Sequence, residues 1–177
     1  MREQPMTSTD VIDFYSELES LGIEIWVDGG WGVDALLGEQ TRPHKDLDIV
    51  IQQQDIPRFR GLVGARGYRD AKLEDAKPRN FVLCDDNGNE IDVHVIVFDD
   101  DGNGLYGQVE KGVMYPSASL TASGIIAGHI VNCISPEWVV KFHSGYELTD
   151  KDLMDVSALC KTFGIELPEE VAHHSKS

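Results

Sequence analysis

Apolar positions near the start of the chain recur with the spacing of an amphipathic helix. They are Val11, Ile12, Phe14, Tyr15, Leu18 and Leu21. Hydroxyl and carboxylate side chains fill positions 7–10 before them, and Gly22 follows. Ser, Thr and Asp are preferred helix caps, and glycine readily adopts the left-handed conformation that ends a helix. The pattern therefore predicts a helix between these two signals.

Short runs of β-branched and aromatic residues predict strands. They cover residues 23–27, 47–51, 81–84, 90–98 and 129–134. Asn87-Gly88 between the third and fourth runs is a strong hairpin signal. The nearly continuous apolar run at 47–51 is typical of a strand buried inside a sheet. Helical spacing over 31–37 and 55–63 predicts helices after the first and second strands.

Two more helices are predicted in the C-terminal third. Ser135 and Pro136 open the first, as cap and first-turn residue. A ridge at i, i+4 and i+8 is formed by Trp138, Phe142 and Tyr146. The second helix follows Thr149 and ends at Gly164. Together these elements predict an α+β fold, in which a small mixed sheet is packed with helices and followed by a C-terminal helical segment.

The charge of the chain limits its partners. Its 15 Lys and Arg against 31 Asp and Glu give a formal charge of −16, which repels phosphate backbones and anionic headgroups and attracts cations. We therefore expect no nucleic-acid and no membrane partner. No apolar run reaches the roughly 18 residues of a membrane span. Cys84, Cys133 and Cys160 have neither disulfide nor metal-ligand spacing, so we expect a cytoplasmic protein.

Two carboxylates stand at the entry to the strand at 47–51. Strand side chains alternate, so Asp46 and Asp48 project on one side, about 6–7 Å apart along the backbone. Paired oxygen ligands favour a hard cation such as Mg²⁺. In the alternative interpretation, Asp46 caps a turn and Asp48 pairs with Lys45 or Arg42.

Asp92 is the candidate for a third carboxylate. Alternation puts Asp92 and His94 on one face of the strand at 90–98. If that strand neighbours 47–51, three carboxylates converge, which suits two-metal phosphoryl chemistry with ions about 3.5–4 Å apart. One carboxylate is then placed to accept a proton from an attacking hydroxyl. The alternative is a strand-end carboxylate paired with a lysine.

Candidate phosphate-binding groups flank the carboxylates in sequence. Gly29-Gly30 precedes a predicted helix and offers backbone amides and the positive end of the helix dipole to a triphosphate. Arg42 and His44 offer cationic or hydrogen-bonding groups for the β and γ phosphates. The alternatives are a simple glycine turn and two solvated loop residues.

A calcium-loop pattern at residues 99–104 with Glu110 is discounted. The spacing fits an EF-hand loop, but an EF-hand requires a helix before it. Residues 90–98 are instead predicted to form a strand. The acidic segment is interpreted as a turn.

Combined motifs give the chain a family resemblance. The run from Trp26 to Gly38 (WVDGGWGVDALLG) followed by 40–48 (QTRPHKDLD) resembles the lincosamide nucleotidyltransferases and, more distantly, the aminoglycoside 2″-nucleotidyltransferases. The similarity to the small lincosamide enzymes continues at 92–94 (DVH), 133–137 (CISPE) and 142–149 (FHSGYELT). It covers most of the chain.

The resemblance implies a polymerase-β-like nucleotidyltransferase fold, with ATP or another triphosphate as donor and transfer of AMP to a drug hydroxyl. From the length of 177 residues we expect one domain, with a catalytic part at 1–115 and a C-terminal extension at 116–177 packed on the same core. Asp46 and Asp48 would be Mg²⁺ ligands, and Asp92 both ligand and general base. The wider superfamily usually has Gly-Ser where this chain has Gly29-Gly30, so backbone amides must contribute more to phosphate binding.

The acceptor expected from the resemblance is a lincosamide, a small cationic antibiotic. An aminoglycoside is the alternative, because the acidic chain attracts either. Tyr106, Tyr115 and Trp138 are candidates to line the drug site, although the helix-spaced Trp138 also fits a core position. A non-catalytic toxin–antitoxin partner is a rival that would not need the three carboxylates. The C-terminal half also offers a surface for a homodimer.

Overall fold

One mixed sheet organises the protein, as seen in a computed structural model that describes residues 5–71, 79–106 and 114–174. Its strands are β1 (Ile25–Asp28), β2 (Asp46–Gln52), β3 (Arg69–Asp70), β4 (Asn80–Cys84), β5 (Glu90–Phe98), β6 (Gly104–Tyr106), β7 (Met114–Tyr115), β8 (Ala122–Ile126) and β9 (His129–Cys133). They lie in the order β3-β4-β5-β2-β1-β9-β8, while β6 pairs with β5 and β7 with β6.

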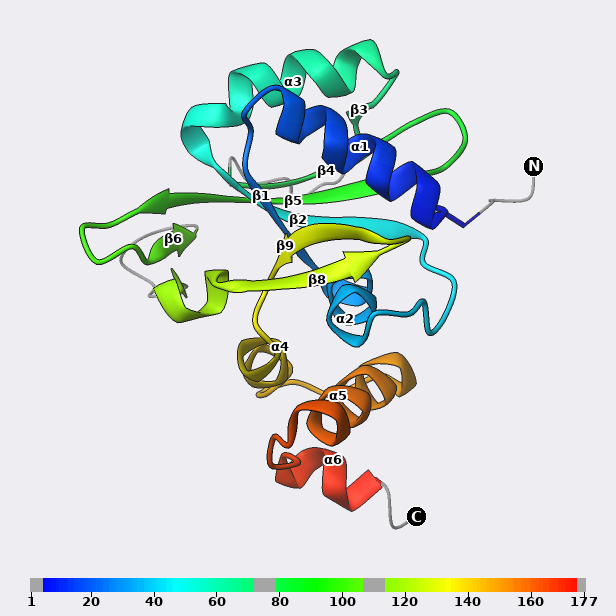
Figure 1. The fold of residues 1–177 in the computed structure, drawn as a ribbon, viewed down its shortest axis with the longest axis vertical. Helices are drawn as coiled ribbons and strands as arrows, with labels where there is room; N and C mark the ends of the chain where they lie inside the picture. Colours follow the sequence, from blue (N-terminus) through cyan, green and yellow to red (C-terminus); the bar gives the residue numbers. More distant parts are fainter. Residues whose placement is uncertain (1–4, 72–78, 107–113, 175–177) are drawn as a thin grey trace.

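Helices cover both faces of this sheet. The α-helices are α1 (Ser8–Ser20), α2 (Gly29–Leu37), α3 (Ile56–Ala65), α4 (Pro136–Phe142), α5 (Asp150–Phe163) and α6 (Glu169–His174), and the short 3-10 helices are η1 (Gln53–Asp55) and η3 (Ser117–Leu120). In Figure 1, α1 and α3 lie above the sheet, whereas α2, α4, α5 and α6 lie below it. The predicted α+β fold is confirmed. No helix of the described ranges is long and apolar enough to cross a bilayer.

Strand alternation divides the apolar residues between the two faces. Those on the α1–α3 face include Ile25, Val27, Leu47, Ile49, Ile91 and Val93. Those on the opposite face include Trp26, Val50 and Ile96, which pack with residues of α2, α4 and α5. Because successive side chains of a strand point to opposite faces, Asp48 and Asp92 must share the second face. The carboxylates therefore project toward α2.

The starts of α1 and α5 follow the predicted capping signals, whereas Ser135 stands at the N-cap of α4 without a side-chain capping hydrogen bond. Thr7 accepts a hydrogen bond from the Asp10 amide while the Asp10 side chain bonds back, forming a capping box on α1. Thr149 and Asp152 form a second capping box, at the start of α5. The left-handed Gly164 ends α5 as expected. A good cap contributes about 1 kcal/mol to helix stability.

Three sequence predictions need correction. The ridge of Trp138, Phe142 and Tyr146 is not on one helix, because α4 ends at Phe142. Strands β6, β7 and β8 were not predicted, since β6 and β8 contain glycine and β7 is only two residues long. Helix α2 begins at Gly29 rather than at Trp31.

The acidic segment after β5 forms a hairpin turn. Asp99 accepts hydrogen bonds from the amides of Asp101 and Asn103 and from the Asn103 side chain, and β6 then pairs back antiparallel on β5. A strand precedes the turn where an EF-hand requires a helix. The discounted calcium-loop pattern is thus confirmed as a turn, with Glu110 outside the described residues.

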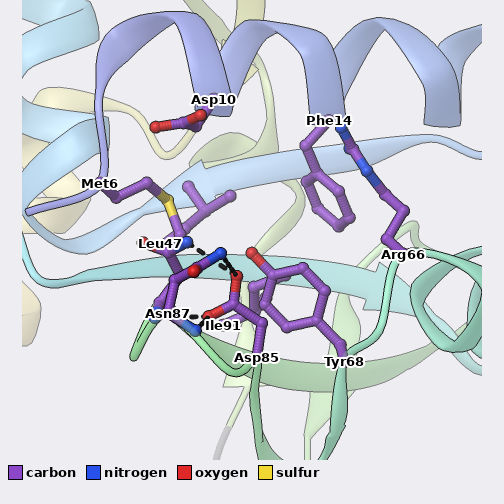
Figure 2. Close-up of a pocket in the computed structure, with 10 residues that line it drawn as sticks. Met6, Asp10, Phe14, Leu47, Arg66, Tyr68, Asp85, Asn87 and Ile91 are labelled. Atoms are coloured by element: carbon purple, nitrogen blue, oxygen red, sulfur yellow. Dashed lines mark hydrogen bonds between the residues drawn. The ribbon is translucent and has the colours of Figure 1, made fainter. Parts of the chain in front are cut away.

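A cavity of about 170 Å³ opens on the α1 face of the sheet. Its lining, drawn in Figure 2, includes Tyr68, Leu47 and Ile91. Asp85, one of its two carboxylates, is already engaged by Asn87 and Asn89 in the β4–β5 turn. Since Leu47 and Ile91 point away from the Asp48 face, this cavity is separate from the carboxylate cluster.

Candidate active site

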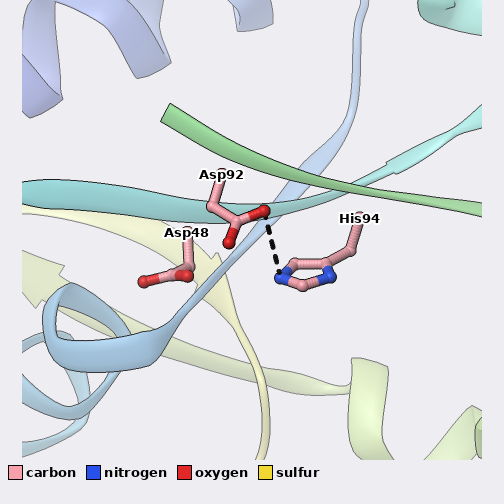
Figure 3. Close-up of side chains that lie close together, drawn as sticks. All are labelled: Asp48, Asp92 and His94. Carbon is pink, nitrogen blue, oxygen red and sulfur yellow. Dashed lines mark ion pairs between the residues drawn. The ribbon is translucent and has the colours of Figure 1, made fainter. Parts of the chain in front are cut away.

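Three candidate site residues converge on the face that α2 covers. Strands β2 and β5 pair in parallel, with Asp48 opposite Asp92. Ligand atoms of Asp48, Asp92 and His94 all lie within 4.8 Å of one another, and Figure 3 shows the three side chains on the same side of their strands. The expected adjacency of the two strands is confirmed.

Asp46 occupies the outer edge of this arrangement. It is exposed and pairs in register with Glu90, one residue pair beyond Leu47 and Ile91. Its charge is among the causes that raise the pKa of both Asp48 and Asp92. Asp46 therefore acts electrostatically on the cluster, and its role as a metal ligand stays a prediction.

A fourth carboxylate, Asp28, was not predicted. The antiparallel pairing of β1 with β2 sets Asp28 opposite Asp48. Burial raises the pKa of Asp48 well above its usual range, and the charges of Asp28, Asp46 and Asp92 raise it further. The cluster thus concentrates negative charge in a half-buried place, which is costly unless a cation neutralises it.

Asp92 has an unsatisfied oxygen. Its Oδ1 is buried and has no hydrogen-bond partner within the described part of the chain. His94 Nε2 lies 3.8 Å from that oxygen, too far for a hydrogen bond. Burial raises the pKa of Asp92, while the neighbouring His94 opposes the shift. A buried carboxylate oxygen without a hydrogen-bond partner is uncommon in folded proteins, so we expect this oxygen to bind another group.

The donor set fits a divalent cation. Carboxylate oxygens from neighbouring strands are the hard ligands that Mg²⁺ prefers. The raised pKa of Asp48 and the unpartnered Oδ1 of Asp92 are both relieved by a bound positive charge. The structure thus contains a candidate acidic cluster at Asp48 and Asp92, as expected from the sequence, and metal binding there stays a prediction.

Gly29 brings the helix turn against the carboxylates. It has a φ of 56°, in the left-handed region, and a Cβ built on it would lie 2.0 Å from Asp48 Oδ2. Its amide donates to Asp28 Oδ1 at 2.8 Å, so Asp28 caps α2. Only glycine tolerates both the conformation and the contact.

Gly30 makes the next close approach. A Cβ there would lie 2.4 Å from His44 Nδ1 and 2.9 Å from an Arg42 guanidinium nitrogen. A serine side chain at this position would collide with both groups. The departure from the Gly-Ser pattern of the superfamily therefore has a steric cause, and Arg42 and His44 occupy the space beside the turn.

Arg42 and His44 are held by other protein groups. One Arg42 nitrogen donates to Asp155 on α5 at 2.8 Å and the other to His44 Nδ1 at 3.0 Å. His44 is 2% exposed, and its Nε2 hydrogen-bonds to the buried Asp34 of α2. The solvated-loop interpretation is thus wrong for His44. Phosphate contacts by Gly29, Gly30, Arg42 and His44 stay predictions.

Aromatic rings extend from the carboxylate cluster toward α4. The Tyr106 hydroxyl lies 3.1 Å from His94 Nδ1, and its ring contacts that of Tyr115. Tyr115 is buried, donates a 3.3 Å hydrogen bond to Asp28, and packs edge-on against Phe142. Burial, then Asp28, raises the pKa of Tyr115 well above its usual range. Tyr115 is thus a buried residue that holds the Asp28 side chain by a hydrogen bond.

Sequence reasoning missed Asp28, Asp34 and Asp155 as parts of the site. Asp28 carried a usable signal, since an Asp before a glycine at a helix start is a preferred cap. Asp34 lies inside α2 and Asp155 inside α5, where a carboxylate is ordinarily interpreted as solvated. Only the tertiary structure reveals that both are buried.

This fold, with carboxylates on neighbouring strands beside a glycine turn, defines a polymerase-β-like nucleotidyltransferase. Solved structures support the class. A lincosamide adenylyltransferase, LnuA with bound lincomycin, superposes with a TM-score of 0.77 at 29% identity over 92% of this chain and 100% of that one. The ANT(2″)-Ia complex with adenylyl-2″-tobramycin has the same fold, with a TM-score of 0.71 at 22% identity over 96% and 97% of the two chains.

Sequence comparison gives the family. The model of the aminoglycoside-2″-adenylyltransferase family matches residues 10–159. A lincosamide resistance protein from Staphylococcus haemolyticus is 30% identical over 90% of this chain and 98% of its own length. The chain belongs to this family of antibiotic nucleotidyltransferases, and the recognition made from its motifs is confirmed.

Proposed function

We propose that the protein transfers AMP from ATP to a hydroxyl of a lincosamide antibiotic in a Mg²⁺-dependent reaction. The observation that supports this most is the pairing of Asp48 with Asp92 on parallel strands, directly against Gly29 at the start of α2. Carboxylates for a cation and helix amides for phosphates then meet in one place. The similarity to the lincosamide resistance protein supports the acceptor class.

Asp46, Asp48 and Asp92 would hold the metal, which we propose to be two Mg²⁺ ions. When bound, the metal would neutralise charge on the phosphates and on the oxygens that attack and leave. The chain itself contributes the amides at the N-terminus of α2, where the helix dipole favours an anion. Gly29 and Gly30 let the turn pack against Asp48, His44 and Arg42, and Arg42 adds positive charge beside the amides that would face the triphosphate.

Asp92 is the proposed general base. The acceptor hydroxyl would give its proton to the carboxylate while its oxygen bonds to the α-phosphorus and pyrophosphate leaves. Oδ1 has no hydrogen-bond partner among the described residues, so one oxygen of the carboxylate would bind the metal and the other would receive that proton. Burial raises the pKa of Asp92 above its usual value, which brings the carboxylate closer to the pKa range suited to a base at neutral pH. His94, nearby on β5, would orient it.

The acceptor side of the proposal uses charge and aromatic surface. The net charge of −16 attracts a cationic drug. The rings of Tyr106, Tyr115 and Phe142 continue from His94 toward Trp138, and a sugar or pyrrolidine ring packs well on such surfaces. Tyr115 itself is only 8% exposed, so Tyr106 and Phe142 would supply most of the contact.

An aminoglycoside is the second candidate acceptor, favoured by the family whose model matches the chain. The toxin–antitoxin alternative fits less well, because a non-catalytic partner has no use for four clustered carboxylates and an orphaned oxygen. A homodimer and a cytoplasmic location, where ATP is available, remain parts of the proposal.

The deciding experiment incubates purified protein with Mg²⁺, ATP and either lincomycin or kanamycin. Mass spectrometry then detects a drug carrying one added AMP. An adduct on lincomycin alone supports the proposal, and one on kanamycin alone moves the acceptor to the aminoglycosides. Absence of both adducts, together with absence of ATP binding, would refute a nucleotidyltransferase.

A further inference from the structure

A buried polar chain connects the C-terminal helix α5 to the glycine turn. Asp34 Oδ1 accepts hydrogen bonds from the amide and hydroxyl of Thr41, at 3.0 and 2.7 Å, and Oδ2 bonds to His44 Nε2. His44 Nδ1 lies 3.0 Å from Arg42, and Arg42 reaches Asp155 at 2.8 Å. Helix α2, the loop before β2 and helix α5 are thereby joined.

The donors and acceptors of this chain have one consistent assignment. An arginine can only donate, so His44 Nδ1 must accept from Arg42. The proton of the neutral imidazole then sits on Nε2 and points to Asp34. Asp34 and Asp155 are 2% and 6% exposed, so each buried carboxylate needs its partner. The hydrogen bonds to His44 and Asp155 therefore fix the position of the Arg42 guanidinium.

The Arg42 guanidinium lies against the glycine turn at Gly29-Gly30. A Cβ on Gly30 would lie within 2.9 Å of an Arg42 guanidinium nitrogen, so the cation packs against the backbone of α2's first turn. The same nitrogen of Arg42 bonds to Asp155. Arg42 Nε is buried without a partner among the described residues, so the hydrogen bonds of the two terminal nitrogens alone hold the guanidinium in this place.

We infer that Asp155 is a positioning residue for the triphosphate of the donor nucleotide. It holds the Arg42 guanidinium over Gly30, so a residue of the C-terminal extension completes the nucleotide end of the site. The inference rests on the proposed function, in which Arg42 lies beside the phosphates. It assigns the 116–177 segment a role in nucleotide binding and none in proton transfer.

The test compares Asp155→Asn with the wild type by calorimetric titration of ATP–Mg²⁺ and by steady-state kinetics. Loss of one charge-assisted hydrogen bond predicts about a tenfold weaker binding of ATP and a similar rise in its KM. The KM of the drug and kcat at saturating ATP should change less than about twofold. Asp150→Asn, an exposed change of the same kind on the same helix, should change none of these quantities.

A second variant separates positioning from general damage to the fold. Asp155→Asn leaves the charge of Arg42 uncompensated, which can itself destabilise the protein. Arg42→Gln with Asp155→Asn replaces the pair by two neutral groups and restores that balance. If Asp155 acts through Arg42, the double variant binds ATP as weakly as Arg42→Gln alone.

The outcomes distinguish a failure of the proposed function from a failure of the positioning role of Asp155. If the wild type binds no ATP–Mg²⁺, the proposed function fails and the role of Asp155 with it. If the wild type binds ATP and Asp155→Asn binds equally well, only the positioning role is overturned. Equal rises in the KM of ATP and of the drug, or additive losses in the double variant, would also overturn it.

Discussion

Replacing Asp48 by asparagine removes one charge from the carboxylate cluster and almost no volume. In the wild type, burial raises the pKa of Asp48 well above its usual range, and Asp28, Asp46 and Asp92 raise it further. An aspartate with a raised folded-state pKa destabilises the protein above that pKa, since the unfolded chain ionises more easily. Without metal at neutral pH, Asp48→Asn should therefore be more stable than the wild type.

The size of the gain follows from the geometry. Side-chain oxygens of Asp48 and Asp92 lie within 4.8 Å, and two unit charges at that distance repel by about 3 kcal/mol at an effective dielectric constant of about 20. Water reaches this half-buried site and weakens the repulsion. We expect a gain of about 1–2 kcal/mol, which raises the melting temperature of a chain of this size by about 2–8 °C.

Thermal unfolding of both proteins from acid to neutral pH, with EDTA or with Mg²⁺, measures this. As the pH falls through the raised pKa of Asp48, the wild-type carboxyl becomes protonated and the advantage of Asp48→Asn should disappear. Added Mg²⁺ should stabilise the wild type and reverse the order. Asp13→Asn, an exposed change on α1, is the matched control. A variant less stable than the wild type without metal at neutral pH would refute the repulsive cluster.

Gly30→Ser should lower stability by about 1–3 kcal/mol, the usual cost of overpacking, because its Cβ would lie 2.4 Å from His44 Nδ1; an unchanged melting temperature would contradict the contact. Arg42→Ala should weaken ATP binding more than drug binding in calorimetry, and the reverse order would move Arg42 to another site. Burial raises the pKa of Cys133 to about 12, so iodoacetamide at mildly alkaline pH should label Cys84 and spare Cys133 in the native protein. Peptide mapping that finds equal labelling would disprove that burial.

The elements with strong periodicity could be predicted from the sequence. The first helix, the central strand after Asp46 and the Asn87-Gly88 hairpin combine apolar spacing with local caps and turn residues, so each is specified by neighbouring positions. The same patterns placed Asp48 and Asp92 on matching faces. Their adjacency depended on a parallel pairing of β2 with β5 that no local signal encodes. The family resemblance supplied that step.

The remaining features depend on tertiary contacts. Asp155 and Asp34 became buried only because α5 and α2 pack around the loop that carries Arg42. His44 looks like a solvated loop residue in sequence and is instead enclosed beside Trp31. Strand β8 was missed because its five residues alternate weakly and contain Gly124, whose missing Cβ lets the strand approach α2.

The most direct test of the account is single-turnover AMP transfer by Asp92→Asn at saturating ATP, drug and Mg²⁺. A carboxylate that serves as both ligand and base should lose on the order of 10² to 10⁴ in rate, and the loss should persist when Mg²⁺ is raised further. His94→Ala, which removes an orienting neighbour, should lose less. Full rescue of Asp92→Asn by Mg²⁺ would contradict the assignment of Asp92 as base, and a larger defect in His94→Ala would transfer that role to the histidine.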